Sequence, residues 1–384
     1  MQNPFKPCWK TILLSLGCWA IAFVSQAQNT DSTKQESAGD EDFSMYDNVG
    51  FADEGSRRYC SPKIEGLSPA KLISVGYDFQ AGYGLGAGAF TSQDKTMNWA
   101  QDSVNVLNSR GLRLGFNIPV ISRTNLVWQM GANYWEQRYF MEDPDGSALQ
   151  TAHPLLQTLS ENGLRTLGVS TTVFKPLDDK RFLLFQGSAD LNGDFSPMGL
   201  MPLKYLKYSA ALVYGLRPNE KKQWGLGLAR TYRVGELNYI PVFLFNWTDP
   251  ANKWGTEILF PARAHVRYTV NPRNMLFGGF ELEGQSYRVW RGSNLSAYRI
   301  QGEDLEIRRG EIRLRAMYEF SLKDFVWLSV QAGYRINYRY EVDRLVGGQE
   351  IYRAFGLLSD EPYVMENRLG NPLYFQISLN LVSP

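Results

Sequence analysis

Apolar and polar residues alternate through the segment Trp254–Asn271, "WGTEILFPARAHVRYTVN". Its even-numbered positions are nearly all apolar, as at Ile258, Phe260 and Val266, whereas its odd-numbered positions are mostly polar or charged. A period of two is that of a β-strand, because successive side chains point to opposite faces of a sheet. A soluble sheet would bury the apolar face, but a membrane barrel turns it to lipid and turns the polar face to the lumen.

The same alternation recurs throughout 69–384. Several runs are as long as a tilted strand must be to cross a bilayer, about ten residues, whereas strands of soluble proteins usually have about five or six. The clearest runs are 73–81, 112–118, 126–134, 254–271, 326–342 and 373–381. Weaker runs lie near 164–174, 181–192, 207–216, 223–234, 238–247, 274–287 and 303–321. The last run changes phase at Arg309-Gly310, as at a β-bulge. The pattern predicts an all-β fold, a transmembrane antiparallel up-and-down β-barrel.

The connections between these runs alternate in length, which is typical of outer-membrane barrels with short turns on the periplasmic side. Short links are "SRTN", "PLDDK", "PNEKK", "NPRN" and "SLKD", and longer links fall near 91–108, 141–163, 193–205, 291–302 and 343–371. The runs number about thirteen, but single-chain bacterial barrels have an even number of strands. The alternation of short and long connections is broken between 217 and 271, so the strand count depends on that region. Two strands there would give about twelve, which we favour, and four would give about fourteen.

The N-terminus has the form of a cleavable signal peptide, residues 1–27. Lys6 and Lys10 precede a short apolar run, and Ser25 and Ala27 are the small residues that a signal peptidase reads, so cleavage is expected after Ala27. A lipoprotein box at "SLGC" is the alternative, but the apolar run continues past Cys18. The leader predicts export, and with the barrel it predicts the cell outer membrane.

Residues 28–68 are polar and acidic and carry few aliphatic side chains. Such a segment cannot bury enough apolar area to fold alone, so we expect a flexible periplasmic segment before the barrel domain, 69–384. A docking peptide for a periplasmic partner is the alternative. Cys60 would be the one cysteine left after cleavage, which excludes an intramolecular disulfide.

Overall composition excludes other classes of protein. The net charge is +1, which gives no reason to expect a nucleic-acid partner. The mean hydropathy is −0.31, and no apolar stretch after residue 27 is long enough for a membrane helix. Aromatic residues reach 14%, as expected for strands and for the girdles at the two membrane interfaces.

The leader with "QAQ", the segment "YIPVFLFNWTDPANKWGTEILFPARAHVRYTVNPRN" and the C-terminal "LYFQISLNL" resemble an uncharacterised outer-membrane β-barrel family of Bacteroidetes-type bacteria. The resemblance covers most of 68–384. It implies a fold and a location, with outer-membrane lipid and the barrel assembly machinery as partners, but no activity. One departure is the end "LVSP", where many barrels end on an aromatic residue that the assembly machinery reads.

Candidate catalytic residues are few, because the chain has only two histidines, His153 and His265. An outer-membrane lipid hydrolase would need a Ser–His pair with an orienting third group. Arg263 and Arg267 flank His265 on its face and supply no carboxylate, and only Glu281 or Glu283 on the next strand could provide one. We expect no enzyme. No cluster of His, Cys or carboxylates has metal-ligand spacing, and we expect no metal and no cofactor.

The polar faces of successive strands carry charges whose signs complement one another. Adjacent strands lie about 4.8 Å apart, so these side chains can meet across the ladder. We expect them to line the lumen as a charged wall that narrows it, with the carboxylates paired to arginines. The candidates are Arg263, His265, Arg267, Glu281, Glu283, Glu311, Arg313, Arg315, Glu319, Arg335 and Arg339.

Two classes of function fit these observations. The first is a small polar pore or ligand-specific channel, whose inward residues select small polar solutes. The second is a filled barrel that acts as an envelope anchor, an adhesin or an accessory subunit through its outer loops. A lipid-modifying hydrolase is a more distant third. The sequence names no substrate, and a fold alone implies none.

Overall fold

The computed structural model describes residues 63–91, 98–151, 153–195, 206–289, 304–345, 352–354 and 361–382. The chain divides into two units, Met1–Ser56 and Arg57–Pro384, and all described residues belong to the second. The expected signal peptide, its cleavage site after Ala27 and Cys60 lie outside the described residues.

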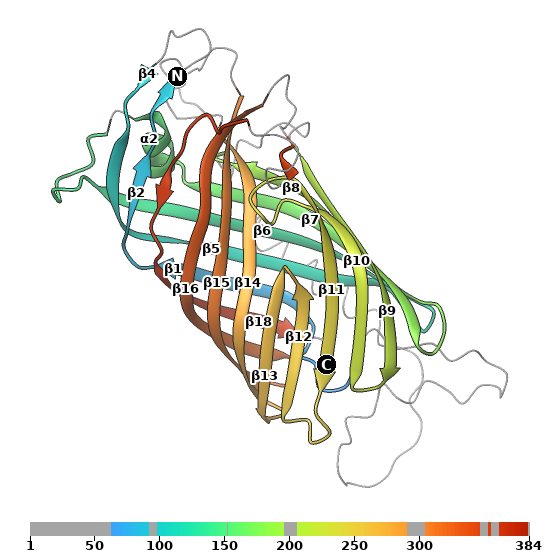
Figure 1. Ribbon diagram of the computed structural model, residues 1–384. Helices are drawn as coiled ribbons and strands as arrows, with labels where there is room; N and C mark the ends of the chain where they lie inside the picture. Colours follow the sequence, from blue (N-terminus) through green and yellow to red (C-terminus); the bar gives the residue numbers. More distant parts are fainter. Residues whose placement is uncertain are drawn as a thin grey trace, which may run out of the picture. The chain divides into compact units, whose positions relative to one another are not determined.

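The second unit is a closed antiparallel β-barrel of fourteen strands (Figure 1). The ring closes because β1 pairs with β18 on one side and with β5 on the other. The strands are β1 (Lys71–Gln80), β5 (Asp102–Arg123), β6 (Leu126–Glu142), β7 (Leu164–Pro176), β8 (Arg181–Gly193), β9 (Lys207–Asn219), β10 (Lys222–Thr231), β11 (Asn238–Thr248), β12 (Trp254–Phe260), β13 (Arg263–Asn271), β14 (Asn274–Val289), β15 (Asp304–Lys323), β16 (Val326–Leu345) and β18 (Leu373–Val382).

Further elements lie at the end of the barrel opposite the short turns, which we call the long-loop end. There β2 (Tyr83–Ala87) pairs with the far part of β5, and β17 (Arg368–Leu369) pairs with β2. β3 (Phe90–Thr91) and β4 (Asn98–Trp99) form a separate small sheet. The helix α2 (Pro154–Glu161) lies between β6 and β7 in the sequence. No helix in the described parts of the chain is long and apolar enough to cross a membrane.

The favoured number of twelve strands is wrong, and the alternative of fourteen is confirmed. The segment Trp254–Asn271 is not one strand but the hairpin β12–β13. Its ladder joins Ile258 to Ala264 and Leu259 to Arg263, so even positions pair with even positions. The alternation therefore continues through the turn without a break. Pro261 was the local signal of that turn, because proline has no N–H to donate to a ladder.

Large apolar side chains cover the outer face of the barrel around its circumference. They are exposed because the chain itself offers nothing to cover them, which is expected of a surface that contacts lipid. Members from different strands include Val75, Phe116, Met130, Val169, Phe185, Leu212, Leu226, Phe243, Val266, Leu276, Leu314, Val330 and Ile377.

Towards the long-loop end the inner face of the wall becomes apolar and the outer face becomes charged. In the middle of β15, Glu311 and Arg313 face the interior, but nearer the long-loop end Ile307 faces the interior. The charged Glu306 and Arg308 then occupy the outer face. The apparent change of phase in 303–321 has this cause. A β-bulge does lie at this height, but its extra residue belongs to β16, between the partners of Gly310 and Glu311.

Phe185 and Gln186 are neighbours on β8 that test which face meets lipid. Phe185 is 38% exposed on the outer face, whereas Gln186 lines a cavity inside the barrel. Phe185→Arg should lower the stability of the inserted barrel by up to about 2–4 kcal/mol, the cost of arginine near the bilayer midplane. Gln186→Arg should cost far less. Urea titration in lipid vesicles measures both, and equal losses would mean that the faces are reversed.

Candidate functional site in the barrel interior

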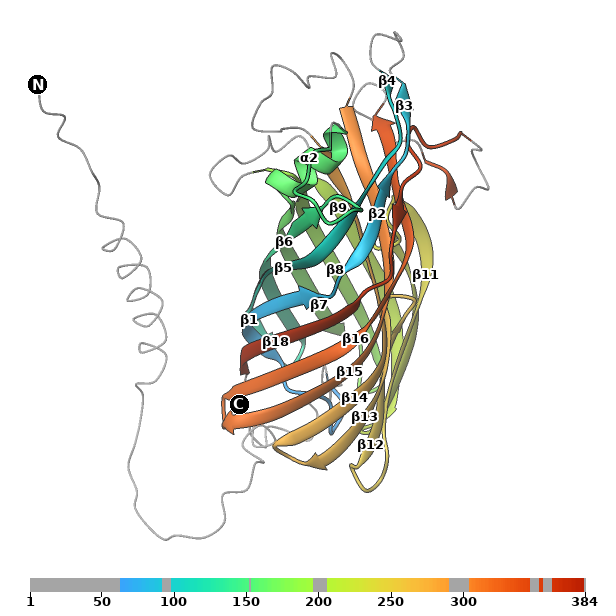
Figure 2. The same cartoon turned by 90° about the vertical axis from the view of Figure 1, so that its left-hand side faces the viewer.

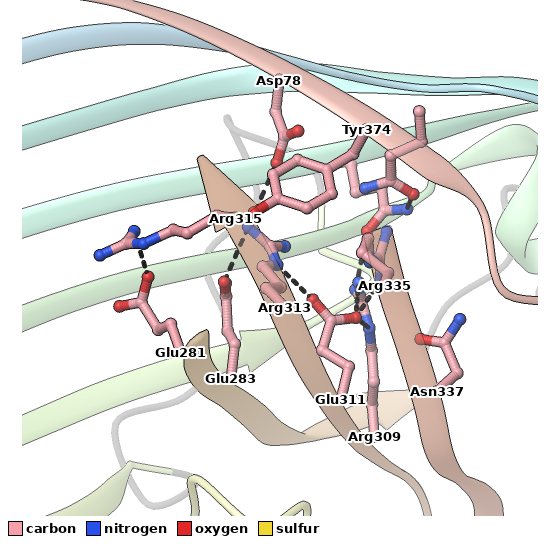
Figure 3. Close-up of polar contacts among 12 residues, drawn as sticks. Asp78, Glu281, Glu283, Arg309, Glu311, Arg313, Arg315, Arg335, Asn337 and Tyr374 are labelled. Atoms are coloured by element: carbon pink, nitrogen blue, oxygen red, sulfur yellow. Dashed lines mark hydrogen bonds and ion pairs between the residues drawn. The ribbon is translucent and has the colours of Figure 1, made fainter. Parts of the chain in front are cut away.

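The centre of the lumen is occupied by a carboxylate among three guanidinium groups (Figure 3). Glu311 on β15 is 1% exposed and accepts hydrogen bonds from Arg309 at 2.8 Å and Arg313 at 2.6 Å. Arg335 on β16 donates to the same carboxylate. β15 places Arg309, Glu311 and Arg313 together because alternate residues of a strand share a face. Burial of such charges is tolerable only when they compensate one another.

The network crosses the lumen to the strands where the barrel closes. Arg313 lies 2.9 Å from Glu283 on β14 and 3.6 Å from Asp78 on β1. Arg113 on β5 joins the same two carboxylates, at 3.0 Å to Glu283 and 3.1 Å to Asp78. Strands β1, β5, β14, β15 and β16 are thereby tied together through the interior, and this part of the lumen is filled with side chains.

A second group of charges continues the network along the wall. Arg315 pairs with Glu281 at 2.6 Å and donates from Nε to His265 Nε2 at 2.9 Å. His265 therefore accepts a hydrogen bond from an arginine, and its ring shares no hydrogen bond with a serine or a carboxylate in the described part of the chain. Its setting is that of a neutral histidine packed in a charged wall, which differs from the Ser–His pair of a hydrolase.

Ten of the eleven lumen candidates lie on the inner face of the barrel, by the register of their strands. Arg267 pairs with Glu257 at 3.0 Å, and Glu319 pairs with Lys71 at 2.5 Å. Arg263 faces the open space of the lumen. The ten are Arg263, His265, Arg267, Glu281, Glu283, Glu311, Arg313, Arg315, Glu319 and Arg335.

Arg339 is the exception, and its expected place in the lumen is wrong. Between Asn337 and Arg339 the bulge inserts one extra residue in β16, which reverses the faces beyond it. The next residue, Tyr340, is buried in the interior, so Arg339 lies on the outer face. There it pairs at 2.5 Å with Glu236 of the β10–β11 loop.

Sequence reasoning missed Asp78, Arg113 and Arg309. Asp78 and Arg113 lie on β1 and β5, which come near β14–β16 only because β1 pairs with the last strand, β18, and closes the ring. Their own strands gave no sign of those neighbours. The sequence placed a β-bulge at Arg309-Gly310, so Arg309 was not counted among the lumen residues. Its Nη1 donates to Gln137 at 2.7 Å, and Gln137 in turn donates to Gln80 and Ser109, at 2.9 Å each.

An apolar core closes the interior above the charge network, at the long-loop end. Helix α2 contributes Leu155, Leu156 and Leu159 to it, and Trp135 and Tyr287 form its floor with ring centroids 5.9 Å apart. Figure 2 shows α2 at this end of the barrel, near β5 and β6. The core excludes water from the axis of the lumen, so no wide polar passage runs straight through the described barrel. Other members include Val104, Val106, Tyr139, Leu164, Leu305, Ile307, Tyr340 and Val342.

His153 occupies the N-cap position of α2 without a capping side-chain hydrogen bond, and its ring connects the helix to the neighbouring loops. Its Nε2 lies 3.1 Å from the carbonyl oxygen of Gly88, and its ring meets the edge of Trp99 at 5.9 Å. Burial lowers the pKa of His153 below its ordinary value, because the imidazolium would lose its water.

Two adjoining cavities remain inside the barrel on the side of β7–β12. The first, of about 470 Å³, lies towards the short turns and reaches His265 and Glu257. The second, also of about 470 Å³, lies further along the wall and reaches the tip of the β12–β13 hairpin. We call the second cavity the chamber. Both cavities are lined by Asn117, Thr172, Leu184, Gln186, Leu259 and Arg263.

The segment Lys63–Ala70 borders the first cavity at the short-turn end. Ile64 is 3% exposed, Thr248 donates to the carbonyl oxygen of Glu65 at 2.8 Å, and Ser68 donates to Glu257 at 3.2 Å. Residues 63–68 belong to the stretch that the sequence assigned to the flexible segment, and in the structure they contact the barrel. The rest of 28–68 lies outside the described residues.

A metal site is absent from the described ranges, which contain no group of three or more His, Cys, Asp or Glu side chains able to hold an ion. Charge in this interior is compensated by ion pairs between side chains.

A family model matches residues 152–355, from the start of α2 to beyond β16. The chain belongs to this family. It is the family described as a domain of unknown function, DUF6268. The match covers β7–β16, including the charge network on β14 and β15 and the strands around both cavities. It assigns no activity.

The barrel is similar to solved outer-membrane β-barrels, at low sequence identity. The NanC porin is 10% identical with a TM-score of 0.30, over 80% of this chain and 100% of the porin. An outer membrane channel from Pseudomonas putida F1 is 12% identical with a TM-score of 0.33, over 86% and 100%. The outer membrane protease OmpT from Escherichia coli is 8% identical with a TM-score of 0.29, over 83% and 99%. Among curated proteins no match is found.

Glu311→Gln should destabilise the barrel strongly, because it leaves Arg309, Arg313 and Arg335 buried without their shared carboxylate. Breaking a buried pair in this way costs about 3–5 kcal/mol. The matched control is Asp324→Asn, which breaks the exposed pair with Arg273 and should cost about 0–1 kcal/mol. Urea unfolding followed by gel mobility measures both, and equal losses would show that the central network does not stabilise the barrel.

Acidification should loosen α2. The unfolded segment binds a proton at an ordinary histidine pKa of about 6.5, whereas His153 in the folded state does not, so local stability falls as the pH drops below that value. The protection factors of the amides of Leu155–Leu159, which correct the exchange rates for the intrinsic effect of pH, should fall between about pH 7 and about pH 5. His153→Gln should remove this dependence. A pH dependence that survives the substitution would assign it to another group.

Proposed function

We propose that the protein is inserted in an outer membrane and acts as a narrow, ligand-specific channel, not as a general diffusion pore. The observation that carries this proposal is the pair of cavities that share one wall inside an otherwise filled lumen. Ligand sites usually have volumes of about 300–1,000 Å³, so each cavity could hold one small solute at a time.

The arrangement of the strands supports the location. The exposed apolar belt fits hydrocarbon, and by the habit of such barrels the short turns face the periplasm. The first cavity would then lie on the periplasmic side, and the apolar core with α2 would lie outside the membrane. A solute could pass between the cavities but could not follow the barrel axis through the charge network.

A filled barrel that serves as an anchor or accessory subunit is the second candidate. It is favoured by the apolar core and the central ion pairs, which give the interior the packing of a structural support. The two proposals differ in one property, because only the channel should carry solute.

The shared wall of the cavities gives the test. Uptake of a panel of labelled small acids and sugars into proteoliposomes should be saturable for one chemical class and should show no unselective leak. Gln186→Trp narrows the junction of the cavities and should lower that uptake at least about ten-fold, because the larger side chain blocks the way between them. Leu212→Trp, on the outer face of β9, is the control and should keep it. Absence of saturable uptake for the whole panel would favour the filled barrel.

A further inference from the structure

The wall of the barrel is incomplete beyond the tip of the β12–β13 hairpin. The ladder with β11 ends at Phe243 and Phe260, and the last hydrogen bond to β14 runs from Leu282 N–H to the carbonyl oxygen of Ala262, at 2.8 Å. β11 starts five residues before that end, at Asn238, and β14 continues to Val289. Over this height the facing edges of β11 and β14 have no strand between them in the described residues. Figure 1 shows the short hairpin between the two longer strands.

The chamber runs through this break in the wall. Ile240 and Val242 line it from the inner face of β11. Leu282 lines it from β14, yet Leu282 pairs with Ile312 and shares with it the outer face of the barrel. A cavity that touches the inner face of one strand and the outer face of the other must pass between their edges. The chamber therefore has a lateral opening between β11 and β14.

On the side nearer the short turns, the opening is bordered by exposed apolar side chains. On the side nearer the long-loop end, it is bordered by the β10–β11 loop. Phe260 at the hairpin tip is 53% exposed, and Phe243 beside it also faces outward. Above, the β10–β11 loop lies against the outer face of β14, where Ser286 donates to the carbonyl oxygen of Gly235 at 3.1 Å. Gly284 allows this approach, since a Cβ there would lie 2.6 Å from the carbonyl oxygen of Arg233. The opening thus contacts lipid on the side nearer the short turns and is limited by the β10–β11 loop on the side nearer the long-loop end.

The walls of the chamber combine apolar side chains with two arginines. Arg233 and Arg263 both line it, and no carboxylate oxygen of the described residues lies within 4.0 Å of either guanidinium. This sets them apart from the paired arginines of the central network. Both side chains are exposed and lie in the field of Glu281, but neither forms an ion pair with it, so their guanidinium donors can bind an acidic group. The apolar lining consists of Leu184, Ala211, Val213, Ala229, Ile240, Val242, Leu259 and Leu282.

We propose that the chamber binds an anionic amphiphile with one acidic group and a single hydrocarbon or aromatic body. The acidic group lies at Arg263, where the chamber meets the first cavity, with Arg233 as a second cation. The apolar body lies against Ile240 and Val242 and extends toward the lateral opening. The inference deepens the proposed function by naming its ligand class, and it rests on that function for the direction of passage.

Equilibrium binding of decanoate tests the site. Full-length mature protein in phosphatidylcholine nanodiscs is titrated by calorimetry, with empty nanodiscs as the reference. The wild type should bind decanoate saturably and decanol much more weakly. Replacing Arg233 and Arg263 together by Gln should weaken decanoate binding about ten-fold or more, the loss expected of a charged hydrogen bond. Arg273→Gln, on an exposed turn, should leave it unchanged.

A second pair of variants tests the space without changing charge. Ala211→Trp fills the chamber from β9 and should abolish binding, whereas Ala316→Trp, on the outer face of β15, should not. Gel mobility confirms that each variant is folded. Decanoate heats equal to those of empty nanodiscs, or equal affinity in the double arginine variant, would overturn the proposal.

The source of the ligand is distinguished by repeating the titration in nanodiscs that contain phosphatidylglycerol. Competition would identify an anionic membrane lipid as the occupant, and unchanged affinity would identify a free amphiphile; either result supports an acidic amphiphile site. Solute flux is measured separately. A barrel that binds decanoate but carries no solute would support the proposed binding site and contradict the proposed channel.

Discussion

The compensation of charge around Glu311 is the constraint on which the interior depends. The Glu311 carboxylate pairs with guanidinium groups from β15 and β16, and Arg313 extends the network to Glu283 on β14 and to Asp78 on β1. None of these charges could remain buried without the others. The same requirement fixes the register, because a slip of one residue would move every one of them to the lipid face. A closed ring of strands in this alignment satisfies it.

Filling one side of the lumen leaves the other side open. The ion network and the apolar core around α2 occupy the space enclosed by β1, β5, β6 and β14–β16. The inner faces of β7–β12 carry small, hydroxyl and apolar side chains, and the two cavities remain between them. The polarity of the interior therefore changes along the barrel axis as well as around the circumference. It is charged in the middle of the barrel and apolar at the long-loop end, while the outer face changes in the opposite sense.

The short hairpin β12–β13 creates the one lateral opening that we find in the described wall. Because β11 and β14 are longer than the hairpin between them, their inner and outer faces meet in one cavity. The β10–β11 loop bounds this opening through Gly235 and holds its own charge, Glu236, against Arg339 on the outer face. The short hairpin thus gives the lumen a lateral connection to the surrounding membrane, whereas the barrel axis is closed by side chains.

The sequence alone determined the barrel, most of its strands and ten of the eleven lumen residues, because side-chain alternation is a local property with a period of two. It could not determine the strand number, since the odd-length turn at Pro261 kept the alternation in phase, nor the side on which Arg339 lies, since the extra residue belongs to the pairing of β16 with β15. Asp78 and Arg113 joined the network only through closure of the ring. The apolar core, the chamber and the unpaired Arg233 and Arg263 were decided by tertiary structure alone, because they depend on which strands face one another across the lumen.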